Sequence, residues 1–210
     1  VNRVTMKGTV DRPGRHVSTV RALAAAWPDR WALADDSNDG TGPLKVLIRL
    51  RRPVLWSGTV REGQTESVRF PDPKAQEVAI ADELVGRHWL PLLLPLTDPK
   101  TVVFAHRKDT GGPRAADVVK AAVPGCGPVF TLWFDASSGL IARIDFSQRE
   151  PGNPAPTQKF FVLFNHRTFD GVMAPGRVEY WHNGGRVEEW NVDAWEFPDR
   201  LDDATFDPPK

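Results

Sequence analysis

Residues 129–197 constrain the fold more than any other part of the chain, because they divide into five runs that each end at a turn. Each run is rich in β-branched and aromatic residues and is followed by Gly, Asn, Asp or Pro, which is the pattern of strands joined by turns. The connections are too short for helical crossovers, so neighbouring strands must be antiparallel. The predicted strands span residues 131–135, 140–146, 158–164, 176–182 and 186–195.

These predicted strands are apolar on both faces. A half-solvated antiparallel sheet would be polar on one face, so both faces here need a cover. We expect a helix to cover one face and the other to line the inside of a curled sheet, which would be either a packed core or a pocket for an apolar ligand. The alternating residues are Phe130, Leu132 and Phe134 against Val129 and Trp133, and Phe160, Val162 and Phe164 against Phe161 and Leu163.

The expected helix lies in the middle of the chain. Asp72 followed by Pro73 is a favourable helix start, and apolar residues recur at helical spacing over residues 74–89. Residues 89–96 are the most apolar run, and two prolines exclude a regular helix there. This segment predicts a lid or plug over a sheet face, with an ordinary core-covering helix as the alternative. Further strands are predicted at 2–10, 15–25, 30–34, 44–50, 53–60, 66–70, 101–106 and 115–123.

The composition limits the classes of function. Lys plus Arg and Asp plus Glu number 27 each, so the excess of positive charge that nucleic acid binding needs is missing. One cysteine, Cys126, excludes a disulfide within the chain. No apolar run reaches the roughly 18 residues of a membrane helix, so the chain is not expected to span a membrane. The chain opens directly on a strand, so an export signal and a first helix are expected to precede it.

No pattern of catalytic or metal-binding residues stands out. None of the five histidines has a metal-ligand spacing, although His166 and His182 could approach one another on neighbouring strands. Nucleophile elbows and phosphate-binding loops are missing from the sequence. We therefore expect no enzyme activity, no catalytic residue, no metal and no cofactor. The acidic residues of the last strand are expected on its solvated face: Glu188, Glu189, Asp193 and Glu196.

Several short motifs in order resemble those of the periplasmic lipoprotein carriers and their relatives, the LolA-like family that includes LppX-type lipid-binding proteins. The carriers have an Arg before the proline of the second motif, where this chain has Trp27. The motifs are an opening strand that ends at Gly8, residues 27–31, residues 132–135 with 139–141, residues 169–172 with Pro175, and residues 205–209.

The resemblance implies a single domain over residues 1–210, with about eleven antiparallel strands curled into an incomplete barrel around helices. It implies a non-enzymatic, monomeric protein of the periplasm or cell envelope that binds the acyl chains of lipids or lipoproteins. An envelope sensor or scaffold that binds a protein with the same fold is the alternative. The residues expected at the pocket or lid are Trp89, Leu92, Leu94, Phe130, Leu132, Phe134, Phe160 and Val162.

Overall fold

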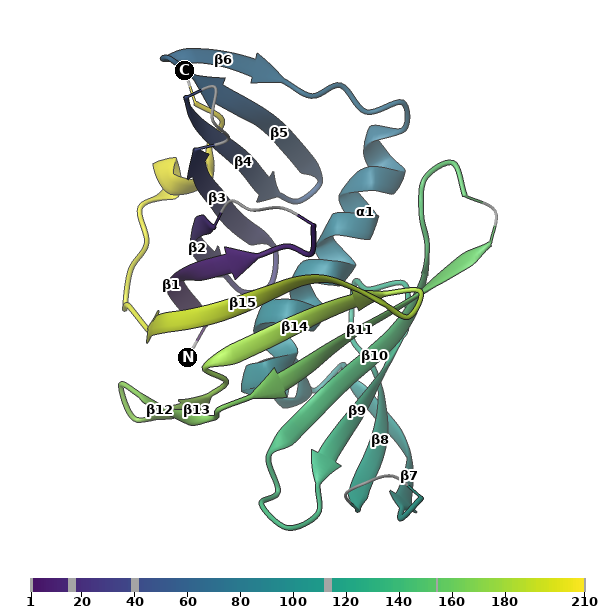
Figure 1. The fold of residues 1–210 in the computed structure, drawn as a ribbon. Helices are drawn as coiled ribbons and strands as arrows, with labels where there is room; N and C mark the ends of the chain where they lie inside the picture. The colour runs from purple at the N-terminus through teal and green to yellow at the C-terminus, as the bar shows by residue number, and fades with distance from the viewer. Residues whose placement is uncertain (1, 15–17, 39–41, 112–114, 154, 210) are drawn as a thin grey trace.

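The structure, a computed structural model, describes residues 2–14, 18–38, 42–111, 115–153 and 155–209. One antiparallel sheet of 13 strands runs through these residues in the order β6-β5-β4-β3-β2-β1-β15-β14-β11-β10-β9-β8-β7 (Figure 1). The N-terminal meander consists of β1 (Arg3–Asp11), β2 (Thr19–Ala26), β3 (Arg30–Asn38), β4 (Pro43–Arg51), β5 (Val54–Arg61) and β6 (Gln64–Ser67).

The C-terminal meander forms the other half of the sheet, and a small hairpin made of β12 and β13 stands apart from it. The structure confirms the five strands predicted within residues 129–197 and the strand predicted at residues 115–123. The strands of the C-terminal meander are β7 (Val102–Asp109), β8 (Ala116–Ala122), β9 (Val129–Asp135), β10 (Ile141–Arg149), β11 (Pro156–Phe164), β14 (Arg177–His182) and β15 (Gly185–Glu196). The separate hairpin consists of β12 (Arg167–Phe169) and β13 (Val172–Ala174).

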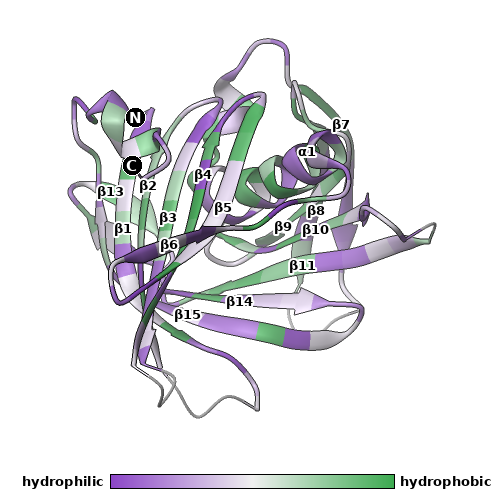
Figure 2. Ribbon diagram, turned by 90° about the horizontal axis from the view of Figure 1, so that it is seen from above, coloured by the Kyte–Doolittle hydropathy of each residue, from purple (hydrophilic) through white to green (hydrophobic). Residues whose placement is uncertain are grey.

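The helical segment connects the two meanders. It comprises α1 (Pro73–Leu84), a π-helical turn η1 (Val85–Trp89) and two 3-10 turns, η2 (Leu90–Leu92) and η3 (Leu94–Thr97). The sheet curls around α1 (Figure 2). The strand number of about eleven was wrong, because the main sheet has 13 strands. A plug is not seen among the described residues either, since the sheet does not close and α1 covers its inner face.

The two meanders join where the first strand of the chain pairs with the last. β1 lies between β2 and β15, and its register shifts between Lys7 and Gly8. A Cβ atom at Gly8 would lie 2.0 Å from the carbonyl oxygen of Asn191 and 2.7 Å from Nε1 of Trp190. The glycine at the end of the first sequence motif therefore allows β15 to approach β1 closely.

The inner face of the C-terminal meander is a continuous row of cross-strand neighbours. Leu132 pairs with Ile144, which pairs with Phe161, and the row continues through Tyr180 to Glu188. All five side chains are buried. The first four side chains form a largely apolar surface under the helical segment, and the fifth, Glu188, places a carboxylate in the interior.

The adjacent row faces outward, and it corrects the expectation that a helix and a hollow lie on opposite faces. Phe160 and Val162 lie on this outer face and are half-buried, while the helical segment occupies the inner face. Side chains cover the outer face in place of a second layer. Phe160 stacks on Trp181 with ring centroids 5.5 Å apart, and the guanidinium of Arg143 lies 4.0 Å from the Phe160 centroid.

We predict that Gly8→Ala lowers the free energy of unfolding by about 1–3 kcal/mol, because a methyl group in this contact must push the backbone of β15 away. Urea denaturation measures the loss. Gly111→Ala is the matched control, since a Cβ there would meet only Asp109 Oδ1 at 3.6 Å. Equal stability of the two variants would contradict the close approach of β1 and β15.

Candidate functional site

The helical segment positions the candidate site. Asp72 caps α1 by accepting a hydrogen bond from the backbone N–H of Ala75 at 2.9 Å, and Pro73 occupies the first turn. At the other end, Gly86 lies against the aromatic core. A Cβ atom there would be 3.0 Å from the Phe161 ring and 3.3 Å from the Phe130 ring. The η1 turn that follows α1 therefore packs closely against the aromatic side chains of the sheet.

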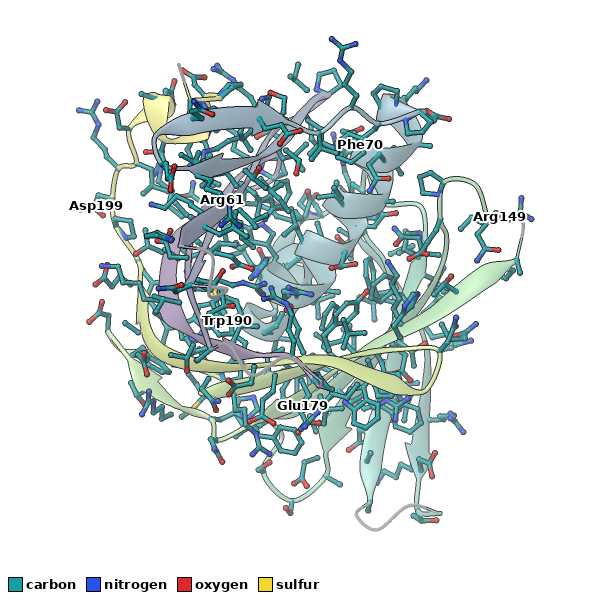
Figure 3. All side chains as sticks on the ribbon, turned by 45° about the horizontal axis from the view of Figure 1, so that its top comes forward. Arg61, Phe70, Arg149, Glu179, Trp190 and Asp199 are labelled. Carbon is teal, nitrogen blue, oxygen red and sulfur yellow. The ribbon has the colours of Figure 1, made fainter. Side chains whose placement is uncertain are left out.

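A groove of about 550 Å³ lies beside the N-terminal half of α1. Its wall on the helix is made of Ala75, Val78 and Ala79, and its opposite wall comes from the end of β10 and the loop before β9. Lys74 and Arg149 stand at its exposed rim, and Arg149 extends from the β10–β11 hairpin at the side of the molecule (Figure 3). The groove combines an apolar wall with a cationic rim.

Polar groups close the inner end of this groove. Asp82 accepts hydrogen bonds from the Gly127 N–H and from Gln148 Nε2, both at 3.2 Å. Burial raises the pKa of the Asp82 carboxyl, and these hydrogen bonds offset part of the rise. Burial and the neighbouring Asp82 raise the pKa of the Cys126 thiol to about 12. Cys126 is therefore protonated at neutral pH and is not a nucleophile.

A buried group of ion pairs lies deeper in the interior. Glu188 on β15 accepts hydrogen bonds from Arg21 on β2 and from Arg87 in η1, each at 2.6 Å. Arg21 also binds Asp35 at 2.7 Å, and Arg12 reaches the same carboxylate at 2.6 Å. Burial alone would raise the pKa of Glu188, but Arg87 and Arg21 outweigh it and lower that pKa to about 2.

Further contacts attach α1 along its length. Glu83 accepts hydrogen bonds from Lys159 at 3.0 Å and from the Tyr180 hydroxyl at 2.9 Å. Glu77 accepts from Arg52, which lies in the turn between β4 and β5, at 2.6 Å. The helix is therefore held to both meanders by charged groups as well as by apolar packing.

The structure separates the eight residues that the sequence predicted for a pocket or lid. Trp89, Phe130 and Leu132 are fully buried beneath or within the helical segment. Leu92, Leu94 and Phe134 are partly buried and pack against the same core. Phe160 and Val162 face outward. None of the eight lines the groove beside α1, so their role in binding stays a prediction.

The expectation that Glu188 lies on a solvated strand face was wrong, because its side chain is inside the molecule and only 6% of the residue is exposed. Its neighbour two residues along the same face, Trp190, is also buried, and that pairing is the signal that could have identified Glu188. The residues that form the groove were missed because most are small. Figure 3 shows side chains from the helix and from the sheet in the space between α1 and the sheet.

Three further observations concern metal sites, the histidines and membrane helices. Within the described ranges, no group of three or more His, Cys, Asp or Glu side chains could hold a metal ion. His182 lies 3.4 Å from Glu150, whereas His166 lies beyond the end of β11. None of the described helices has the length and apolarity needed to cross a membrane.

Two solved structures share this fold. A LolA superfamily protein from Nitrosomonas europaea matches over 99% of this chain and 90% of its own, with a TM-score of 0.57 and 11% identity. A DUF1329 family protein from Desulfovibrio piger matches over 98% and 90%, with a TM-score of 0.59 and 10% identity. No family model matches the sequence, and no curated protein matches it. The fold is LolA-like, as the sequence motifs predicted.

We predict that Glu188→Gln lowers the free energy of unfolding at neutral pH by about 2–3 kcal/mol, because two buried guanidinium groups each lose one of their two carboxylate partners: Arg21 keeps Asp35 and Arg87 keeps Glu83. The ordinary pKa of this group is 4.5 and the folded value is about 2. The stabilisation is therefore complete above pH 4.5 and is lost as the pH falls toward 2.

Denaturation followed between pH 2 and pH 7 tests both parts of this prediction. The variant should lose the part of the acid dependence that Glu188 causes. Glu189→Gln is the control, since Glu189 is half-buried and pairs with the exposed Arg186. If the two variants had the same stability and the same acid dependence, Glu188 would not hold the interior together.

Proposed function

We propose that this protein is a non-enzymatic component of the cell envelope that binds the acyl chain of a lipid or lipoprotein in the groove between α1 and β10. The observation that carries the proposal is an apolar groove beside the inner helix of a LolA-like fold. Its volume of about 550 Å³ lies within the range of small-molecule sites. Each buried methylene group would contribute about 0.8 kcal/mol to binding.

The rim of the groove favours an anionic head group. Lys74 and Arg149 lie at the exposed end, where a carboxylate or phosphate could remain in contact with water. The one carboxylate at this rim, Asp72, is engaged in capping α1. The acyl chain would extend inward along Ala75, Val78 and Ala79. Movement of α1 away from the sheet would extend the groove to Trp89, Phe130 and Leu132.

We predict that Val78→Glu weakens binding of a fluorescent long-chain fatty acid at least tenfold, because a carboxylate would stand in the path of the chain. Val78 is suited to this test because it is only half-buried, whereas a charge at the fully buried Leu132 would unfold the protein. Val54→Glu is the matched control, since Val54 is 63% exposed on β5 and lies outside the groove.

Two outcomes would reject lipid binding in this groove. One is an organic extract of the purified wild-type protein that contains no lipid by mass spectrometry, together with no uptake of the probe. The other is equal affinity of the Val78 and Val54 variants for the probe. A loss of stability in the Val78 variant is checked by its thermal unfolding.

We predict that the double variant Lys74→Glu and Arg149→Glu weakens binding of the fatty acid roughly threefold to tenfold and leaves a neutral acyl alcohol unaffected. The charges are exposed, so the effect should shrink as salt is added. Titrations of both probes at low and high salt measure it. Equal losses for the charged and the neutral probe would show that these side chains do not contact the head group.

A second candidate function is an envelope sensor or scaffold domain that binds a protein. Two observations favour it. Large aromatic side chains such as Trp31, Trp89 and Trp190 fill the centre of the molecule. At the same time, apolar side chains are exposed on β7 at one edge of the sheet. A pull-down that yields one stoichiometric partner and no lipid would support this candidate over lipid binding.

A further inference from the structure

The two open edges of the sheet differ in length and chemistry. β6 forms one edge with four exposed residues, all polar: Gln64, Thr65, Glu66 and Ser67. β7 forms the other edge with eight residues, seven of them exposed. The edges lie at opposite ends of the molecule (Figure 1). A short polar edge resists pairing with another chain, whereas a long edge with apolar residues favours it.

β7 divides into an apolar and a basic segment. Val102, Val103 and Phe104 are 58%, 54% and 41% exposed. Ala105, with φ of 56°, forms a bulge in the pairing with β8. The basic segment, His106–Lys108, follows it. Among the described residues β7 pairs only with β8, so the backbone groups on its other side have no strand partner there and could bond an added strand.

The charges around β7 leave two cations in excess. Asp117 pairs with His106 at 2.9 Å, and Asp109 pairs with Arg107 at 3.5 Å. Lys108 and Lys120 have no carboxylate partner within the described part of the chain. Lys120 lies on β8 opposite Phe104 and lines a hollow of about 450 Å³ on the outer face. A partner that carries carboxylates would therefore find two exposed lysines available for ion pairs.

We propose that β7 is a docking edge for an extended peptide of a partner protein, which adds antiparallel to β7 as a further strand. Its acidic residues lie beside Lys108, and its β-branched residues lie beside Val102 and Val103. Lys120 lies one strand further in and on the opposite face of the sheet from Lys108, where a long acidic side chain next to Phe104 would reach it. Strand addition of this kind takes its affinity from backbone hydrogen bonds and its specificity from alternate side chains. The proposal gives the second candidate function a surface and does not depend on lipid binding.

A second copy of this chain fits the same edge poorly in the registers that include the basic segment. Two antiparallel β7 strands centred on Ala105 would place Lys108 opposite Val102 and Arg107 opposite Val103. A register centred on Arg107 would oppose cations to cations, which destabilises cross-strand pairs. The basic segment therefore discourages pairing between copies and favours an acidic partner.

The test uses the full chain and short labelled peptides, with binding measured by fluorescence anisotropy. The probe carries glutamates followed by alternating valine and threonine, and a second peptide has lysines in place of the glutamates. Two further versions of the acidic peptide are N-methylated on alternate amides. Strand addition predicts that methylation of one alternate set abolishes binding and that the other set is tolerated, because only one set of amides faces β7.

The charge contacts are tested by the double variant Lys108→Glu and Lys120→Glu, which should weaken the acidic peptide roughly threefold to tenfold. Arg69→Glu with Arg200→Glu is the control of equal charge change, since both arginines are exposed and distant from β7 in sequence. The proposal is overturned if the acidic peptide fails to bind, or if the acidic and basic peptides bind alike. Equal effects of the two methylation patterns overturn it too.

Two results would assign the edge differently. If light scattering shows that the wild type is a dimer and that the Lys108 and Lys120 variant is a monomer, the occupant of the edge is a second copy and the proposal is overturned. A natural protein partner that binds the Lys108 and Lys120 variant as well as the wild type would do the same. That second result would leave the candidate function as a protein-binding domain intact, with its surface elsewhere.

Discussion

The contact of Glu188 with Arg21 and Arg87 joins the three parts of the molecule. Arg21 belongs to the N-terminal meander, Glu188 to the C-terminal meander, and Arg87 to the helical segment. Apolar packing is non-directional, so the apolar inner face of the sheet alone would allow the helical segment several positions. Buried charges tolerate only the geometry in which they are paired, because an unpaired buried charge is very costly. The ion pairs therefore set where the helical segment lies.

The position of the helical segment determines where space remains between it and the sheet. In η1, directly after α1, Gly86 and Trp89 pack closely against the aromatic core around Phe130 and Phe161. At the N-terminal end the helix carries small residues, and the loop opposite contributes Gly127 and Pro128. The groove thus arises where small side chains face one another. In the proposed binding mode, a ligand that reached further would have to break the contacts of Glu83 with Lys159 and Tyr180, so the ionic attachment of the helix would oppose its entry.

The sequence predicted those elements that depend on neighbouring residues, and it did not predict contacts between segments that are distant in the chain. Alternation and turn residues predicted the late strands, and Asp72 with Pro73 predicted the start of α1. The contact between Glu188 and Arg87 joins residues 101 positions apart in the sequence, so no local pattern could reveal it. The sidedness of Phe160 and Phe161 was ambiguous for the same reason: both positions are aromatic, and only the curl of the sheet distinguishes inside from outside.

The outer face explains why an apolar row survives without a second layer over it. Planar guanidinium groups lie over aromatic rings, as Arg143 does over Phe160 and Arg177 over Phe164, with centroid distances of 4.0 and 4.2 Å. Such stacking shields the ring face from water while the charged group stays hydrated. On β7 this cover ends at Arg107, whose guanidinium lies 5.5 Å from the Trp133 centroid. Phe104 has no ring or cation contact within the described residues, and its neighbours on the outer face are exposed too. The edge strand is therefore where this way of covering the sheet is incomplete.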